Sequence, residues 1–168
     1  MRKAITLLGL LALLSALAAP PIALSAPAEK YRVFVFTGGA PAYAEKGVKA
    51  IKDLGKANGF GVQSNGDPAM FNAADLARFR AVIFLDTTGS PLNAAQEAAF
   101  EAYFGAGGGF VGVGSAVETE PGWQFLTDIL GTRSAGKLAA QTVTNKVADR
   151  GHDASKNLPE YWNLNDTY

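Results

Sequence analysis

The amino-acid sequence predicts an α/β fold with a flavodoxin-like, doubly wound and mainly parallel sheet. Three observations predict it. Short β-branched and aromatic runs alternate with segments of helical periodicity, the connections between them are short, and glycine-, proline- or asparagine-rich turns separate them. Strands that alternate with helices pair in parallel through right-handed crossovers. The expected strand order is 2-1-3-4, followed by a fifth strand.

The first strand is expected at residues 31–37, where nearly every position is apolar or aromatic. Such a run is typical of a strand that is covered on both faces. Residues 45–58 then read as an amphipathic helix, with Val48, Ile51 and Leu54 expected toward the sheet.

The second and third strands are expected at residues 60–64 and 80–86. A short helix at 73–79 lies between them, and Asn72 can cap its first turn. The strand at 80–86 carries five apolar residues in succession, so it is the clearest buried strand of the chain.

The next helix is expected at residues 94–104, after Asn93 at the capping position. Gln96 stands three residues later, which is the spacing of a reciprocal capping box. A glycine-rich segment ends this helix, and residues 110–113 follow as a further buried strand.

The last expected elements are a helix at residues 121–130 and a strand at 141–147. The strand alternates between polar and apolar residues, which indicates an edge or half-exposed strand. From residue 149 onward the chain is polar and rich in turn residues, so no further strand is expected.

Residues 1–28 have the layout of a secretory signal peptide. Arg2 and Lys3 precede an apolar run at 4–19, and small residues follow at 23–28. The alternative is an uncleaved membrane anchor, although the run is short for a bilayer span. We expect export to the periplasm or the extracellular space, no membrane association after cleavage, and one domain at 29–168.

Composition excludes several classes of function. Removing Arg2 and Lys3 leaves 13 of the 15 basic residues against 15 acidic ones, a formal charge of −2, which provides no footprint for nucleic acid. There is no cysteine, so thiolate nucleophiles and thiolate metal sites are excluded. With His152 as the one histidine, no His-rich metal site is expected, and the sequence leaves the cofactor unknown.

Ligands of doubly wound sheets bind outside the carboxyl ends of the strands, where the strand order reverses. The loops at residues 37–43, 86–90 and 114–123 are expected to meet there. They combine hydroxyls, carboxylates and aromatic rings, a mixture that suits a carbohydrate better than a phosphate. The predicted ligand-binding residues are Thr37, Tyr43, Asp86, Thr88, Ser115 and Glu118.

Several of these features have a structural alternative. Gly38-Gly39 could cradle a phosphate, but no phosphate-binding glycine motif is present, which favours a plain turn. Trp123 suits the core as well as a ligand wall. The turn after residues 110–113 resembles a nucleophile elbow, yet its central position is Gly114, so acyl transfer is disfavoured.

The chain resembles the trehalose-utilisation (ThuA-like) family of the class I glutamine-amidotransferase-like superfamily. The most specific match is the helix-plus-strand segment at residues 92–113, Leu-Asn-Ala-Ala-Gln-Glu through Gly-Gly-Gly-Phe-Val-Gly-Val. The resemblance implies a flavodoxin-like fold and an association with carbohydrate metabolism. Supporting matches lie at residues 33–37, 82–89, 119–120, 149–152 and 158–160.

The chain also departs from the family pattern. The family usually has a histidine in a G-[IV]-H-S-A elbow, where this chain has Gly114, and an Arg-His pair where it has Tyr43-Ala44. The end at 165–168 resembles the start of the family's Asp-Glu-Trp-Tyr segment. We therefore expect a domain that is incomplete at its C-terminus, either a shortened member or a truncated reading frame.

Two functions remain open. One is an enzyme that processes a sugar or oxidised sugar, for which Glu120 and His152 are the predicted catalytic residues. The other is a catalytically inactive module that binds a sugar or another protein. The expected partner is a small carbohydrate of trehalose or disaccharide type, and the sequence leaves the oligomeric state open.

Overall fold

The computed structural model describes residues 30–42, 44–136 and 139–166. The predicted signal peptide and Tyr43 lie outside these residues. None of the helices in the described ranges is both long and apolar enough to cross a bilayer.

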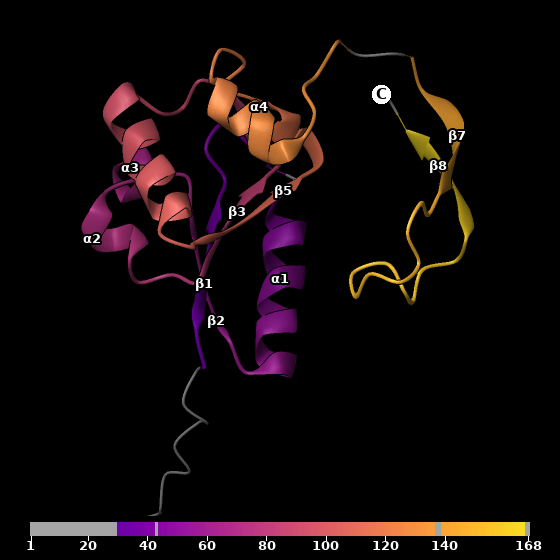
Figure 1. Ribbon diagram of the computed structural model, residues 1–168, viewed down its shortest axis with the longest axis horizontal. Coiled ribbons are helices and arrows are strands. Elements are labelled where there is room, and N and C mark those ends of the chain that lie inside the picture. Colours follow the sequence, from indigo (N-terminus) through magenta and orange to yellow (C-terminus); the bar gives the residue numbers. More distant parts are fainter. Residues whose placement is uncertain (1–29, 43, 137–138, 167–168) are drawn as a thin grey trace, which may run out of the picture.

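The centre of the fold is a four-stranded parallel sheet with the order β2-β1-β3-β5 (Figure 1). This order confirms the predicted 2-1-3-4 arrangement and the flavodoxin-like class. The reversal of strand order falls between β1 and β3. The four strands are β1 (Arg32–Phe36), β2 (Gly61–Asn65), β3 (Ala81–Leu85) and β5 (Gly109–Val113).

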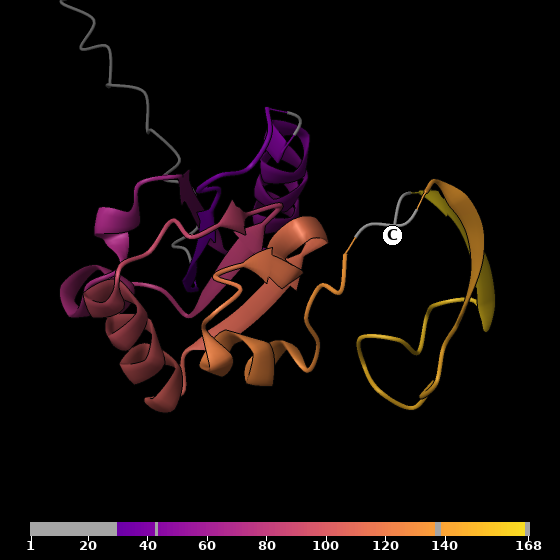
Figure 2. The same cartoon turned by 90° about the horizontal axis from the view of Figure 1, so that it is seen from above.

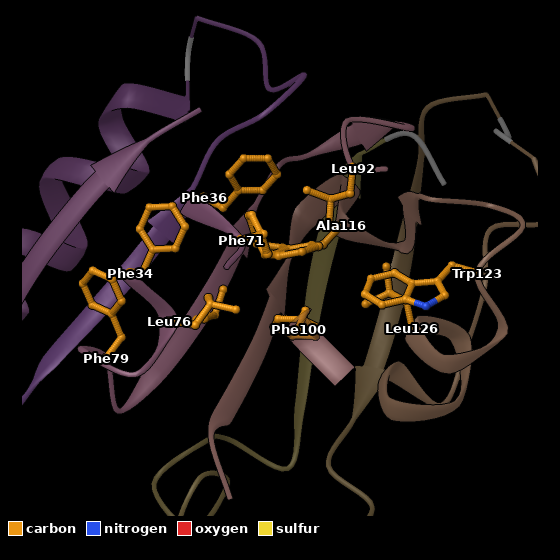
Figure 3. Close-up of a cluster of buried hydrophobic side chains, with 12 residues drawn as sticks. Phe34, Phe36, Phe71, Leu76, Phe79, Leu92, Phe100, Ala116, Trp123 and Leu126 are labelled. Carbon is orange, nitrogen blue, oxygen red and sulfur yellow. The ribbon is translucent and has the colours of Figure 1, made fainter. Parts of the chain in front are cut away.

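Most of the core lies on one face of this sheet. Phe34 and Phe36 of β1 point to it, and Phe36 packs edge-on against Phe71 with ring centroids 4.8 Å apart. Figure 3 shows how this aromatic cluster extends to Phe100 and Trp123. The helices that contribute to it are α2 (Ala73–Leu76), α3 (Ala94–Gly105) and α4 (Gln124–Leu130).

The opposite face is covered by α1 (Ala44–Asn58), which gives the doubly wound arrangement. The side of α1 toward the sheet runs through Ala44, Val48, Ile51 and Gly55, at the i, i+4, i+7, i+11 spacing of one helical face. Leu54 lies off this stripe and is 56% exposed, so its predicted burial is wrong.

Helix starts follow their capping residues. Asn72 caps α2, and Asn93 and Gln96 form the predicted reciprocal capping box of α3. The predicted start of α4 at residue 121 is wrong, because residues 120–123 form a turn in which the Trp123 N–H donates to the Glu120 carbonyl.

Short elements surround the carboxyl edge of the sheet. The two-residue strands β4 (Thr88–Gly89) and β6 (Glu118–Thr119) pair in parallel and were not predicted. Two 3-10 turns complete the connections, η1 (Pro68–Met70) and η2 (Gly114–Val117).

The prediction that residues 110–113 form a buried strand is only half right. Val111 is 47% and Val113 is 39% exposed. Both side chains lie on the α1 face of the sheet, since they pair in register with Ile83 and Leu85. The apolar cluster beneath α1 contains residues of β1, β2 and β3 but none of β5, which leaves this part of the face open.

The predicted fifth sheet strand is wrong. Residues 141–147 contribute β7 (Gln141–Lys146), which pairs antiparallel with β8 (Tyr161–Asp166) in a separate hairpin. Figures 1 and 2 both show this hairpin apart from the four-stranded sheet. The alternating pattern of β7 fits an edge strand of the main sheet as well as a strand of a separate hairpin. Strand β8 was not predicted because asparagines interrupt its apolar residues.

Candidate functional site

The loops that follow β1, β3 and β5 begin at the same edge of the sheet (Figure 1). Thr37 follows β1, Asp86 follows β3, and Gly114-Ser115 follows β5. Because these strands are parallel neighbours, their carboxyl ends place these residues along one edge. The predicted grouping of Thr37, Asp86 and Ser115 therefore agrees with the fold.

A hydrogen bond connects the loop after β1 to the loop after β3. The Thr88 hydroxyl donates to the Gly39 carbonyl over 3.0 Å. Gly39 has φ +71°, and a Cβ there would lie 2.5 Å from the Thr88 carbonyl oxygen, so no other residue fits without movement. The Ala40 N–H donates to the Thr37 carbonyl. Gly38-Gly39 thus forms a tight turn that is braced by Thr88.

A second set of bonds joins the loops after β3 and β5. The Asp86 N–H donates to the Val113 carbonyl over 3.0 Å, and the Ser115 N–H donates to Asp86 Oδ1 over 3.3 Å. Asp86 has φ +50°, a left-handed conformation that aspartate tolerates better than most residues. The half-buried Asp86 carboxylate is therefore fixed beside the turn that follows β5.

The loop around β6 is held by buried polar groups. The hydroxyls of Thr87 and Thr119 share a hydrogen bond of 2.6 Å and are shielded from solvent. Glu120 is 4% exposed, and its Oε1 accepts from the Leu92 N–H over 2.6 Å. Its own N–H donates to the Gly89 carbonyl over 2.7 Å. The Glu120 carboxylate is therefore part of the scaffold that connects this loop to the start of α3.

Two cavities lie near this edge, and they separate the predicted residues. One of about 570 Å³ is lined by Thr37 together with Ser64, Asn65 and residues of α1. The other, of about 290 Å³, is lined by Glu118 with Thr119, Arg133 and residues of α4. Asp86, Thr88 and Ser115 line neither of the two. The candidate site is thus a polar edge with a hollow on the side of α1 and another beside β6.

The remaining predicted residues lie elsewhere. Trp123 is 7% exposed, packs against Phe100, and donates from its indole N–H to Glu101 over 2.8 Å, as expected of a core residue. His152 lies in the exposed connection between β7 and β8, where its Nδ1 accepts from the Ala154 N–H over 3.1 Å. Figures 1 and 2 show this connection apart from the carboxyl edge of the sheet.

One acidic group in the first turn of α3, Glu97, has a perturbed pKa. Burial, and then the nearby charges of Glu120 and Glu101, raise the pKa of Glu97 above its ordinary value. Within the described ranges, no group of three or more acidic or histidine side chains is arranged to hold a metal ion.

Sequence reasoning overlooked Ser64 and Asn65, which line the larger cavity. Asn65 ends β2, and its carbonyl accepts from the Thr37 N–H over 3.0 Å. The signal was available, because a polar residue at the end of β2 reaches the same edge as Thr37. The apolar pattern of residues 60–64 is weaker than that of the other strands, so the end of this strand is less clearly marked in the sequence.

Comparisons with known proteins agree with this architecture. The family model for trehalose utilisation, ThuA, matches residues 32–168. Among solved structures, the chain is similar to a ThuA-like protein from Bacteroides uniformis, with a TM-score of 0.70 and 24% identity. The match covers 88% of this chain and 63% of the other, so the chain spans less than two thirds of that relative. No curated protein matches the chain at a significant level.

Proposed function

Since the chain belongs to the trehalose-utilisation (ThuA) family, we propose that it binds a sugar or oxidised sugar of disaccharide type. The family supplies the association with carbohydrate utilisation. The binding edge is formed by the loops after β1, β3 and β5, and the larger cavity adjoins it at the loop after β1, where Thr37 lines it.

The observation that carries the proposal is the presence of unused hydrogen-bonding groups at this edge. In the described part of the chain, no hydrogen bond engages the hydroxyls of Thr37 and Ser115 or the second carboxylate oxygen of Asp86. Sugar hydroxyls both donate and accept, so a carboxylate oxygen and two hydroxyls offer them suitable partners. The Gly39–Thr88 and Asp86–Ser115 bonds hold the loops in place before a ligand arrives.

The positions of Glu120 and His152 favour a binding function over an enzymatic one in which these two residues are catalytic. The Glu120 carboxylate accepts from the Leu92 N–H in a buried position, and His152 lies in the hairpin connection. A general acid and a general base need to reach the same substrate within hydrogen-bond distance. We therefore assign Glu120 a positioning role in the scaffold and leave His152 outside the site.

Calorimetry with trehalose, other disaccharides and oxidised disaccharides tests the proposal. We expect one of them to bind, and Asp86→Asn to weaken its Kd by about tenfold or more, because a hydrogen bond to a charged group contributes about 1.5–3 kcal/mol. Asp153→Asn is the matched control, since this aspartate is highly exposed in the hairpin connection. A folded protein that binds none of these sugars would exclude the proposed function.

The catalytic alternative is tested by turnover with the same sugars. If a product forms, and Glu120→Gln and His152→Ala each abolish its formation while leaving the fold and the sugar affinity intact, the enzymatic function replaces the binding function. If the binding proposal is right, His152→Ala leaves sugar affinity unchanged.

We also propose that the protein is exported, on the signal-peptide layout of residues 1–28. Cleavage after Ser25 or Ala28 is expected from the small residues there. N-terminal sequencing of the protein from the periplasmic and extracellular fractions checks this. Recovery of the chain only in the membrane fraction, with Met1 to Ala28 still attached, would support the anchor instead.

A further inference from the structure

In the turn after β5, the side chain of Asp86 fills the space beside Gly114. Gly114 has φ +61°. A Cβ built on it would overlap Asp86 Oδ1 and would lie 3.0 Å from Asp86 Cγ and 3.7 Å from Oδ2. The Asp86 carboxylate therefore occupies the place that a side chain at position 114 would take.

Asp86 also holds the residues on both sides of Gly114. Its N–H donates to the Val113 carbonyl, and its Oδ1 accepts from the Ser115 N–H. The backbone and side chain of one residue thus bracket the glycine. A side chain at 114 would have to displace the carboxylate and break the bond to Ser115.

The other carboxylate oxygen has no such role. Among the described residues, Oδ2 accepts no hydrogen bond and no cationic side chain pairs with Asp86. The Ser115 hydroxyl is likewise without a hydrogen bond, although the Ser115 amide is fixed by Oδ1. An ionised carboxylate oxygen in a half-buried position favours a hydroxyl or another donor as its partner.

We propose that Gly114 and Asp86 act as a pair that determines ligand specificity. The lack of a side chain at 114 allows β3 to supply the carboxylate that a ligand meets at the turn after β5. Asp86 Oδ2 accepts a hydrogen bond from a sugar hydroxyl there. The ligand half of this inference rests on the proposed carbohydrate function, whereas the steric half does not.

A purely structural role for Asp86, as a cap of the η2 turn, makes a different prediction. Asp86→Asn keeps the size of the side chain and an oxygen that can accept from the Ser115 N–H, but it removes the charge. If Asp86 only caps the turn, Asp86→Asn leaves ligand affinity unaltered. If the Asp86 carboxylate binds the ligand, Asp86→Asn lowers that affinity.

The steric half is tested by thermal unfolding of the full chain. Gly114→Ala, Asp86→Ala and the double variant form a cycle. Gly131→Ala is the matched control, because Gly131 has φ +70° and nothing within 4 Å of its Cβ position. We expect Gly131→Ala to lower Tm by about 4 °C from backbone strain alone.

Gly114→Ala is expected to lower Tm by about twice that amount when Asp86 is present, and by no more than the control when Asp86 is alanine. If Gly114→Ala costs the same in both backgrounds, the two residues are independent and the proposal is overturned. The Asp86→Ala background keeps the test valid even if Gly114→Ala alone fails to fold.

The ligand half is tested with trehalose and oxidised trehalose in calorimetry. Asp86→Asn and Gly114→Ala are each expected to raise Kd at least about tenfold, with no further loss in the double variant, since both remove the same contact. If the unaltered protein binds sugar and both variants bind equally well, the pair does not set specificity although the proposed function stands. If the unaltered protein binds neither sugar, the proposed function fails together with the ligand half.

Discussion

The carboxylate of Glu120 accepts a 2.6 Å hydrogen bond from the Leu92 N–H, although the two residues are 28 positions apart. Glu120 has φ +47°, a conformation that costs free energy for a residue with a side chain. The surrounding structure holds it there through this bond and through the bond from its N–H to the Gly89 carbonyl. The loop after β6 is thus tied to the start of α3 by a residue of the predicted catalytic pair.

Glu120→Ala is expected to destabilise the fold by about 1–3 kcal/mol, because it leaves the buried Leu92 N–H without its acceptor. Urea denaturation of the variant measures the change. Glu160→Ala, which alters an exposed carboxylate of the hairpin connection, serves as the control. A Glu120→Ala variant as stable as this control would refute the scaffold role.

The buried Thr87–Thr119 pair is expected to show a strong coupling free energy. Thr87→Val or Thr119→Val alone leaves the partner hydroxyl buried without a hydrogen bond, which costs about 1–3 kcal/mol. The double valine variant should lose less than the sum of the two, since it removes both polar groups. Additive losses in denaturant unfolding would mean that the two hydroxyls do not depend on one another.

Ionisation of Glu97 is expected to lower the free energy of unfolding as pH rises. Burial and the charges of Glu120 and Glu101 raise its pKa above the ordinary 4.5. A carboxyl whose pKa is raised in the folded state binds its proton more tightly there, so its stabilising contribution is full below the unfolded pKa. That contribution is lost as pH rises through the folded pKa.

Glu97→Gln should therefore raise Tm relative to the parent at pH 7, and this gain should shrink as pH falls through the raised pKa of Glu97 toward 4.5. Thermal unfolding across this pH range measures the difference. Glu160→Gln controls for the loss of one negative charge at an exposed position. A Tm difference that does not vary with pH would show that Glu97 titrates alike in the folded and unfolded chain.

The open face and edge of β5 are expected to promote self-association. Val111 and Val113 are exposed, and β5 is the last strand of the sheet in the described residues. Unprotected strand edges with apolar side chains pair readily with other chains, and an added lysine opposes this. Val111→Lys should weaken association about tenfold or more in sedimentation velocity. A parent protein that stays monomeric at all concentrations would contradict this expectation.

The central fold could be predicted because the sequence patterns that mark its strands and helices are local. The apolar runs of β1 and β3 and the capping pair Asn93 and Gln96 need no tertiary information, and the structure confirms them. The exposure of Val111 was not predictable in this way, since it depends on how far α1 extends across the sheet. The pairing of β7 with β8 also depends on a partner that lies 15 or more residues further along the chain.

The candidate site was predictable as an edge but not as a set of contacts. Strand ends placed Thr37, Asp86 and Ser115 together, because parallel strands bring their carboxyl ends to one edge. The burial of Glu120 and the position of the Asp86 carboxylate beside Gly114 depend on left-handed backbone conformations. Such conformations at non-glycine residues leave no clear pattern in a sequence.

The central claim is that one ligand site lies at the carboxyl ends of β1, β3 and β5. A titration of the isotopically labelled protein with trehalose and oxidised disaccharides, followed by backbone amide chemical shifts, tests it most directly. The site described here predicts saturable shifts that are largest at Thr37, Gly39, Asp86 and Ser115, with the β7–β8 hairpin unchanged. Shifts confined to the hairpin, or no saturable shift with any of these sugars, would contradict it.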